Sequence, residues 1–334
     1  MAAMGARAQH ARRLRSQWLS GPRAHDVVDV VTHLLAVQAQ DPRGARLTVR
    51  ARSTGLVAGD VDAALDDGRL VVSWLNRGTL HLVAAEDFWW LHDLLADRQA
   101  TANERRLTQE GVDAAAATRG IRVLADAVAE GPQSRTRLRE RLDRAGVPTA
   151  GQAFVHVLFA ASRQGLLVRG PTVDGEQAFV SPVSWIGPRP DPLDETEALR
   201  RLGERYLAAH RPAAPRDLAR WAGLPLGPVT AALDGLPGGA DGRVPAMPAP
   251  RLLGPVDPSL LGWDGRDEIV GDHTGIVTTN GLFRPFVLVD GRAVATWRIA
   301  GSRVRSIDWL DPVAERVRRA VDAEVADVER FLSG

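Results

Sequence analysis

The sequence contains no cysteine and no lysine among its 334 residues, so all 42 of its basic residues are arginine. Without cysteine there is no disulfide framework and no thiolate metal site. Without lysine no side chain can form a Schiff base, and the P-loop pattern G-x-x-x-x-G-K-[ST] cannot occur. These two absences exclude disulfide-stapled scaffolds, ordinary P-loop ATPases and enzymes with a lysine nucleophile.

Other missing patterns narrow the function further. No stretch approaches 18 uncharged apolar residues, and the N-terminal MAAMGARAQHARRLRSQWL has arginines but no apolar core. The metalloprotease pattern H-E-x-x-H and the hydrolase pattern G-x-S-x-G are absent, and the eight histidines are dispersed. We therefore expect a cytoplasmic protein without membrane contact, nucleotide cofactor, other cofactor or metal.

The charge is balanced overall but unevenly distributed. The net charge is +1, yet residues 1–55 hold nine arginines against three acids, and residues 134–145 hold five against two. Such basic segments suit an anionic partner, because the planar guanidinium fork binds two phosphate oxygens at once. Scattered, solvated surface charge is the alternative interpretation, and charge alone leaves both open.

A pattern of three helices and a hairpin occurs three times. The middle copy is clearest: helices are predicted over 119–130, over 135–146 after a capping Ser134, and over 151–165, with a hairpin turning at Asp174-Gly175. The first copy has helices at about 6–19, 25–40 and 59–68 and a hairpin of two alternating strands that turns at Asn76-Arg77-Gly78. The third begins at Asp194, and its wing region, 237–250, is rich in Gly and Pro and degenerate.

The chain changes character after about residue 250. The turn signals Asn280-Gly281 and Asp290-Gly291, flanked by β-branched residues, predict a small antiparallel sheet, and a last helix closes the chain. The predicted class is α+β and mainly helical. The predicted segments are winged-helix units over 1–115, 116–190 and 191–250 and a C-terminal β-domain with its closing helix over 251–334.

Three segments resemble one known family. They are LLAVQAQDP (34–42), SWLNRGTLHLV (73–83) and RLLGPVDPSLLGW (251–263), the last continued by NGLFRPFVLVDGRAVATWR (280–298). Together they are similar to the winged-helix DNA-binding family that contains the AlkZ-type, azinomycin-resistance DNA glycosylases. The resemblance implies three tandem winged helices that form a concave, DNA-sized cleft, followed by a small β-domain.

The most informative segment is Gln38-Ala39-Gln40. The AlkZ-type enzymes carry a Gln, apolar, Gln triplet here, and the resemblance implies that both glutamines act in removing the damaged base. In an uninterrupted helix, residues two apart point about 200° from each other. Because Pro42 disfavours helical geometry before it, we expect the helix to end near Ala39 or Gln40, with Gln38 pointing inward at its last turn and Gln40 free to turn to the same side. The alternative is two polar residues at a frayed helix end.

The chemistry of such a pair suits a cationic substrate. An N7-alkylated purine already carries positive charge, so it leaves without a general acid. The protein must position water and stabilise an oxocarbenium-like sugar, which a glutamine carbonyl can do without titrating. Since no lysine is present, a side-chain Schiff base cannot cleave the strand, and we expect a monofunctional glycosylase.

Arginines in the basic segments and at the hairpin turns are the predicted DNA contacts. They are Arg12, Arg43, Arg46, Arg77, Arg135, Arg137 and Arg284. Arg77 is equally well explained as a residue that stabilises the hairpin, and the turn that precedes Arg284 as purely structural. Thr79 and His81 are candidate cleft residues, although a mid-strand histidine is more often a hydrogen-bonded core residue.

The sequence thus predicts a DNA-repair glycosylase that hydrolyses the N-glycosidic bond of bulky alkylated purines. N7-guanine or N3-adenine adducts of a genotoxic natural product are the expected lesions, in a self-resistance role, and interstrand crosslinks are left open. The partner is double-stranded DNA, and we expect a monomer. A non-catalytic winged-helix DNA-binding protein is the alternative, and a protein-interaction scaffold is a third.

Overall fold

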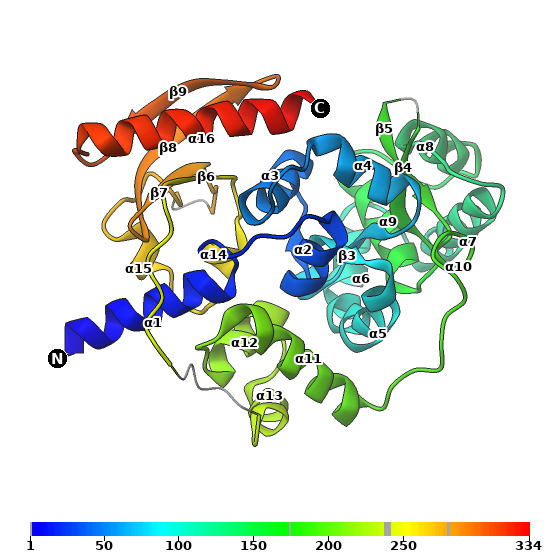
Figure 1. Cartoon of the computed structure of the whole chain (residues 1–334). Coiled ribbons are helices and arrows are strands. Elements are labelled where there is room, and N and C mark those ends of the chain that lie inside the picture. Colours follow the sequence, from blue (N-terminus) through cyan, green and yellow to red (C-terminus); the bar gives the residue numbers. More distant parts are fainter. Residues whose placement is uncertain (1, 174, 237–241, 279–280) are drawn as a thin grey trace. The chain divides into compact units, whose positions relative to one another are not determined.

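A computed structural model describes residues 2–173, 175–236, 242–278 and 281–334 (Figure 1). The fold is α+β, with more helix than strand and two antiparallel sheets, which confirms the predicted class. The chain forms two compact units: unit 1 comprises Met1–Val61 and Leu199–Gly334, and unit 2 comprises Asp62–Ala198. The four consecutive segments predicted from the sequence stay a prediction, because these units are defined by contacts and not by repeats.

Unit 2 surrounds a sheet with helices. Strands β2 (Leu70–Trp74), β3 (Leu80–Ala84), β4 (Val168–Val173) and β5 (Glu176–Val180) pair antiparallel in the order β3-β2-β4-β5. The helical elements are η1 (Asn76–Gly78), α5 (Ala85–Leu95), η2 (Ala96–Gln99), α6 (Ala100–Gln109), α7 (Ala114–Ala129), α8 (Arg135–Arg144), α9 (Ala153–Arg163) and α10 (Pro182–Trp185).

The two hairpins of unit 2 share one sheet, because β2 pairs with β4 at Val72 and Arg169. The expectation that β2 and β3 alternate between buried and exposed positions was wrong: every residue of both strands is buried. The reason is that β2 lies inside the sheet and that α5 and α9 pack against these strands.

The helix signals of the middle copy are confirmed. The Ser134 side chain caps α8 by accepting from the Arg137 backbone N–H, and Asp113 caps α7 in the same way at Ala116. Gly146 follows α8 with φ +66°, a conformation that glycine adopts at low cost. Of the predicted turn Asp174-Gly175, Asp174 lies outside the described residues.

Unit 1 combines the N-terminal helices with the C-terminal part of the chain. Helices α4 (Ala58–Asp66) and α11 (Glu195–His210) lead out of it and back into it. Its other elements are α1 (Ala2–Ser16), α2 (Val27–Leu34), β1 (Val37–Gln38), α3 (Pro42–Arg52), α12 (Pro215–Ala222), α13 (Leu226–Leu233), β6 (Arg251–Leu253), α14 (Pro258–Leu261), α15 (Asp267–Val270), β7 (Phe286–Val289), β8 (Arg292–Ala300), β9 (Arg303–Trp309) and α16 (Glu315–Ser333).

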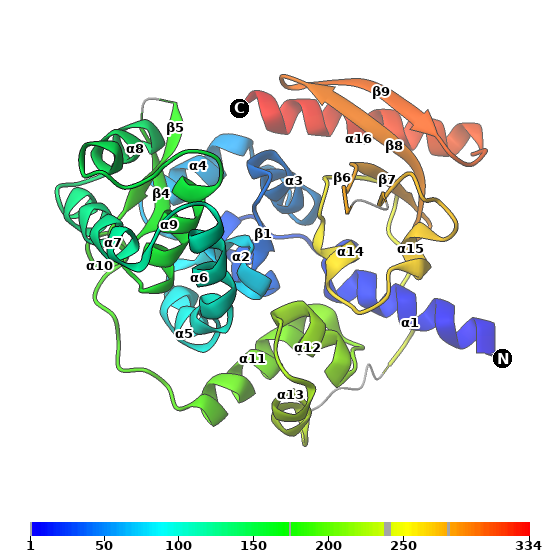
Figure 2. The ribbon, with the colours of Figure 1, turned by 180° about the vertical axis from the view of Figure 1, so that it is seen from behind.

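The C-terminal sheet has the order β6-β7-β8-β9, and α16 lies along it (Figures 1 and 2). Trp297, Val321 and Val328 belong to the core between the sheet and this helix. The predicted hairpin turn at Asp290-Gly291 is confirmed, with both residues at positive φ. Asn280 lies outside the described residues, as do 237–241 of the third predicted wing, whose remaining residues, 242–250, form no helix or strand.

The helix expected over residues 25–40 is shorter than predicted. It ends at Leu34, because Leu35 takes a left-handed conformation (φ 68°), and the chain then turns into β1. Residues 34–37 are all apolar and almost completely buried. The break at Leu35 carries this buried run out of the helix and into the strand.

No helix of the described chain is both long and apolar enough to cross a membrane.

Candidate functional site

The glutamine triplet lies in the short connection between α2 and α3 of unit 1. Helix α3 was not predicted, although Asp41-Pro42 carries its signal: the Asp41 side chain caps the helix at the Arg43 N–H, and Pro42 occupies the first turn. Val37 and Ala39 are buried, whereas Gln38 is half-buried and Gln40 is exposed. Extended backbone with a period of two therefore places both glutamines on the side away from the core.

The two glutamine side chains meet. Gln38 Nε2 donates a hydrogen bond of 2.8 Å to Gln40 Oε1. The predicted inward-pointing Gln38 on a last helical turn was wrong, because Gln38 belongs to a strand, but the two amides do lie together. Within the described residues, Gln38 Oε1 and the Gln40 amide have no hydrogen-bond partner, so a carbonyl oxygen and an N–H group remain for a ligand or water.

A buried ion pair fixes helix α3, which follows the triplet. Arg52 and Asp257 are both completely buried and joined by two hydrogen bonds of 2.9 Å. The other Arg52 N–H groups donate to the Gln17 backbone and side-chain oxygens and to the Thr48 carbonyl, so all five donors are used. Burial raises the pKa of Asp257, but the Arg52 charge and hydrogen bonds from Arg52 and Ser259 outweigh it and hold the pKa below its usual value.

The RLLGPVDPSLLGW segment supplies this support. Besides Asp257, its Gly254 lies so close to α3 that an added Cβ would stand 3.2 Å from the Gly44 backbone. Arg50 of α3 donates to the Leu252 carbonyl and pairs with Glu324 of α16. The segment therefore positions the helix that directly follows the glutamines.

The basic N-terminal segment is less available than its charge count suggested. Four of the nine arginines in residues 1–55 form ion pairs with carboxylates elsewhere in unit 1, namely Arg7, Arg13, Arg50 and Arg52. Sequence alone could not show this, because the partner acids lie more than 200 residues away in the chain.

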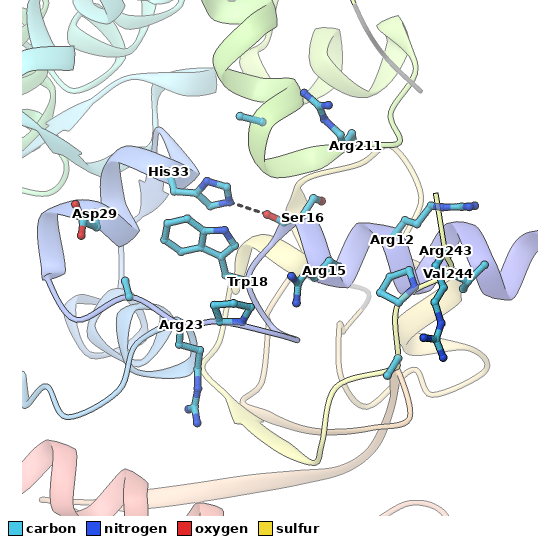
Figure 3. A pocket seen from close by; sticks show the side chains of 15 residues that line it. Arg12, Arg15, Ser16, Trp18, Arg23, Asp29, His33, Arg211, Arg243 and Val244 are labelled. Atoms are coloured by element: carbon cyan, nitrogen blue, oxygen red, sulfur yellow. Dashed lines mark hydrogen bonds between the residues drawn. The ribbon is translucent and has the colours of Figure 1, made fainter. Parts of the chain in front are cut away.

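Three other N-terminal arginines line a pocket of about 1350 Å³ within unit 1 (Figure 3). These are Arg12, Arg15 and Arg23, and Arg211 and Arg243 join them from the C-terminal part of the unit. Trp18 stacks on His33 in the pocket wall, with ring centroids 3.8 Å apart. Of the predicted DNA contacts, Arg12 lies here, but Gln38 and Gln40 do not line the pocket.

The hairpin residues of unit 2 are mostly enclosed. Arg77 is half-buried at the tip with φ 53°. Thr79 is half-buried, and its hydroxyl donates to the Asn76 carbonyl. His81 is 2% exposed, and its Nδ1 lies 2.9 Å from the Thr79 carbonyl. Burial is the main reason why the pKa of His81 falls to about 4, so the ring is neutral near pH 7.

Arg135 of α8 belongs to a cluster of arginines and aromatic rings in unit 2. Arg135 and Arg139 each lie 4.7 Å from the Phe154 ring, and Arg169 lies between Trp74 and Phe179 at 5.5 and 5.3 Å. Arg169 Nε is buried without a hydrogen-bond partner in the described structure. Arg169 was missed because its strand context, VRGPTV, gives no signal.

The remaining predicted contacts are surface positions. Arg43, Arg137 and Arg284 are exposed, and Arg46 is half-buried and donates to the Pro42 carbonyl of its own helix. Within the described residues, no group of three or more His, Cys, Asp or Glu side chains could hold a metal ion.

Comparisons with known proteins agree with one another. Residues 31–331 match the protein family described as DNA glycosylase AlkZ-like. An interstrand DNA cross-link repair glycosylase from Streptomyces sahachiroi is 27% identical over 96% of this chain and 94% of its own length. The solved structure of Streptomyces sahachiroi DNA glycosylase AlkZ superposes with a TM-score of 0.80 at 23% identity, over 98% of this chain and 96% of that one.

Proposed function

The chain belongs to the family of AlkZ-like DNA glycosylases, and from this premise we propose that it hydrolyses the N-glycosidic bond of bulky alkylated purines in double-stranded DNA. The hydrogen-bonded pair Gln38–Gln40 carries the proposal. N7-guanine and N3-adenine adducts of a genotoxic natural product, as in self-resistance, are the lesions we propose. The relative named for interstrand cross-link repair supports including crosslinks among the substrates.

The geometry suggests how the two glutamines would act together. The Gln38–Gln40 hydrogen bond orients both amides, which leaves Gln38 Oε1 as an acceptor for the attacking water. The same carbonyl dipole offers partial negative charge to the oxocarbenium-like sugar as the cationic base leaves. The neighbouring carboxylate, Asp41, already accepts the Arg43 N–H as a helix cap. We therefore assign it to the fold and not to proton transfer.

The proposed architecture is the one that the family resemblance implies, with three tandem winged-helix units and a monomer that encloses DNA in a concave cleft. The two β-hairpins of unit 2 and the three consecutive helices α11, α12 and α13 support it. No lysine is available for a Schiff base, which supports monofunctional hydrolysis over strand cleavage.

Single-turnover excision from a duplex that carries N7-alkylguanine tests the assignment. Gln38→Ala and Gln40→Ala should each lower the rate about 10²–10³-fold, the usual effect of losing one preorganised polar group, with unchanged melting temperature and duplex affinity. Gln40→Glu should be impaired less than Gln40→Ala, because it places negative charge near the cation. Gln9→Ala, an exposed glutamine of α1 in the same unit, is the matched control.

Each possible result decides between two interpretations. Wild-type excision rates in both alanine variants would refute the catalytic role. A lowered melting temperature with a normal rate per folded molecule would make the pair structural. Duplex binding without any excision by the wild type would favour the non-catalytic DNA-binding alternative.

The pH profile is a second test of the same chemistry. Neither glutamine titrates, so the rate should stay flat over the neutral range. A rate that falls as pH drops through the range of a carboxylate would indicate a general base and would point to Asp41.

A further inference from the structure

The pocket of unit 1 concentrates unneutralised positive charge. Arg12, Arg15, Arg23 and Arg211 make hydrogen bonds to backbone carbonyls of Gly242, Ser20, Ser53 and Leu207, respectively. In the described part of the chain none of these four, and not Arg243, is ion-paired with a carboxylate. Among the described lining residues the single acid is Asp29, and it is hydrogen-bonded to none of them.

The wall of the pocket is held in an unusual conformation. Trp18 has φ 56°, a region that costs a bulky residue on the order of 1–3 kcal/mol and that persists where the surroundings enforce it. His33 stacks on the Trp18 ring at an interplanar angle of 6° and lies 2.6 Å from the Ser16 carbonyl through Nε2 (Figure 3). Burial, helped by Arg52 and Arg205, lowers the pKa of His33, so this stack adds no positive charge.

The volume of the pocket favours a polymer over a small ligand. A volume of about 1350 Å³ exceeds the roughly 300–1,000 Å³ of ordinary small-molecule pockets. The five arginines come from α1, the loop after it, the end of α11 and the segment after α13, so they surround the pocket (Figure 3). A basic groove with an aromatic wall is the usual arrangement for a nucleic-acid strand.

We infer that this pocket binds the phosphodiester backbone of one DNA strand, as an anchor separate from the glutamine pair. The inference rests on the proposed function for its choice of DNA. Charge complementarity carries it: five guanidinium groups line the pocket, none is ion-paired with a carboxylate of the described residues, and their planar forks suit phosphate oxygens. The glutamines would act on the lesion, whereas the pocket would fix the register of the DNA.

Duplex binding measured by fluorescence anisotropy at several salt concentrations tests the inference. The variant is Arg211→Gln/Arg243→Gln, because Arg211 bonds only to the Leu207 carbonyl one turn before it and Arg243 is exposed. Affinity should fall about tenfold or more. The log–log salt slope should become shallower by about 0.9 for each phosphate of the duplex that the variant no longer neutralises.

Two controls keep the result specific. Arg298→Gln/Arg303→Gln removes the same two charges from β8 and β9 of unit 1, where the arginines are exposed and paired with Asp308 and Glu329, and it should change neither affinity nor slope. Trp18→Phe should remove part of the DNA-induced change in tryptophan fluorescence. If DNA bound at another surface of the protein, the variant would show the same change as the wild type.

The outcomes also separate this inference from the proposed function. Excision by the glutamine variants tests the proposed function, whereas the duplex affinity of the Arg211→Gln/Arg243→Gln variant tests this inference. Wild-type affinity and slope in this variant would overturn the inference even if excision is real. A larger thermal stabilisation by pyrophosphate or ATP than by an oligonucleotide would also overturn it. Absence of excision in the wild type, with binding still dependent on the pocket, would overturn the proposed function alone.

Discussion

Two groups of arginines in unit 1 differ in their burial and in their hydrogen-bond partners. At the end of α3, Arg52 is completely buried, uses all five donors and faces Asp257. In the pocket, Arg12, Arg15 and Arg23 reach only backbone carbonyls. The chain itself supplies the anion of Arg52, whereas the described residues supply none to the pocket arginines. The difference separates arginines that maintain the fold from arginines that are available to a partner.

Unit 2 contains an intermediate case. Arg169 is largely enclosed between two aromatic rings, as a structural arginine would be, but it has no carboxylate among the described residues, and its Nε is unpartnered. Burial first, and then the nearby charge of Arg135, lowers its pKa to about 10. Its environment thus disfavours the charge that it carries.

The largest expected effect comes from breaking the structural group. Arg52→Met should lower the free energy of unfolding by about 3–5 kcal/mol, because it leaves Asp257 buried and unpaired. Denaturant unfolding followed by circular dichroism measures this. The double variant Arg52→Met/Asp257→Leu should recover most of that stability, since removing both partners leaves no isolated charge. Arg211→Gln, from the pocket group, should change stability by less than about 0.5 kcal/mol. A stability decrease in Arg211→Gln as large as in Arg52→Met would show that the fold requires the pocket arginines as much as it requires Arg52.

Acid should lower the stability of the protein through a second buried group of unit 1, the imidazole of His210. Burial, with help from His33 and Arg52, lowers the pKa of His210 to about 3 despite its hydrogen bond to Tyr206. Because the unfolded chain takes up this proton near pH 6.5, stability is fully present above that pH. It should fall by up to about 1.4 kcal/mol per pH unit down to the folded pKa.

The His210→Phe variant keeps a ring in the stack with Tyr206 and cannot titrate. Its stability should therefore depend less on pH between about 6.5 and 3 than that of the wild type. Equal slopes for wild type and His210→Phe would show that another group governs the acid response.

The sequence predicts local features of the fold better than its long-range pairings. The cap at Ser134, the turn at Asp290-Gly291 and the closing helix are local features, each encoded within a few neighbouring residues, and the structure has them. The end of α2 was misplaced because Leu35 takes a left-handed conformation, which the apolar run from Leu34 to Val37 does not reveal. The pairing of the two hairpins in one sheet depends on tertiary contacts that periodicity does not carry.

The candidate site was predictable to a similar extent. The triplet identified both glutamines through the family resemblance, and their contact is set by strand geometry that the sequence had suggested only as a helix end. The charge count of residues 1–55 mixed two populations, since counting cannot tell whether an acid from a distant part of the chain lies nearby. Arg12 is both a predicted DNA contact and a pocket residue, and its role stays a prediction, whereas Arg211, Arg243 and Arg169 had no local signal.

The smallest expected effect is the most discriminating, because it has the opposite sign to that of Arg52. Arg169→Met removes a charge that no carboxylate in the described chain balances and keeps apolar bulk between Trp74 and Phe179. The free protein should therefore gain about 1 kcal/mol in its free energy of unfolding, as relief of an unsatisfied buried polar group allows. Duplex affinity at low salt should fall in the same variant if the unpaired charge serves an anion, so that stability and binding move in opposite directions. Arg98→Met, which removes an exposed arginine paired with Glu195 in the same unit, should change neither. A decrease of stability in Arg169→Met would place this residue with Arg52, among the arginines whose charge the fold itself requires.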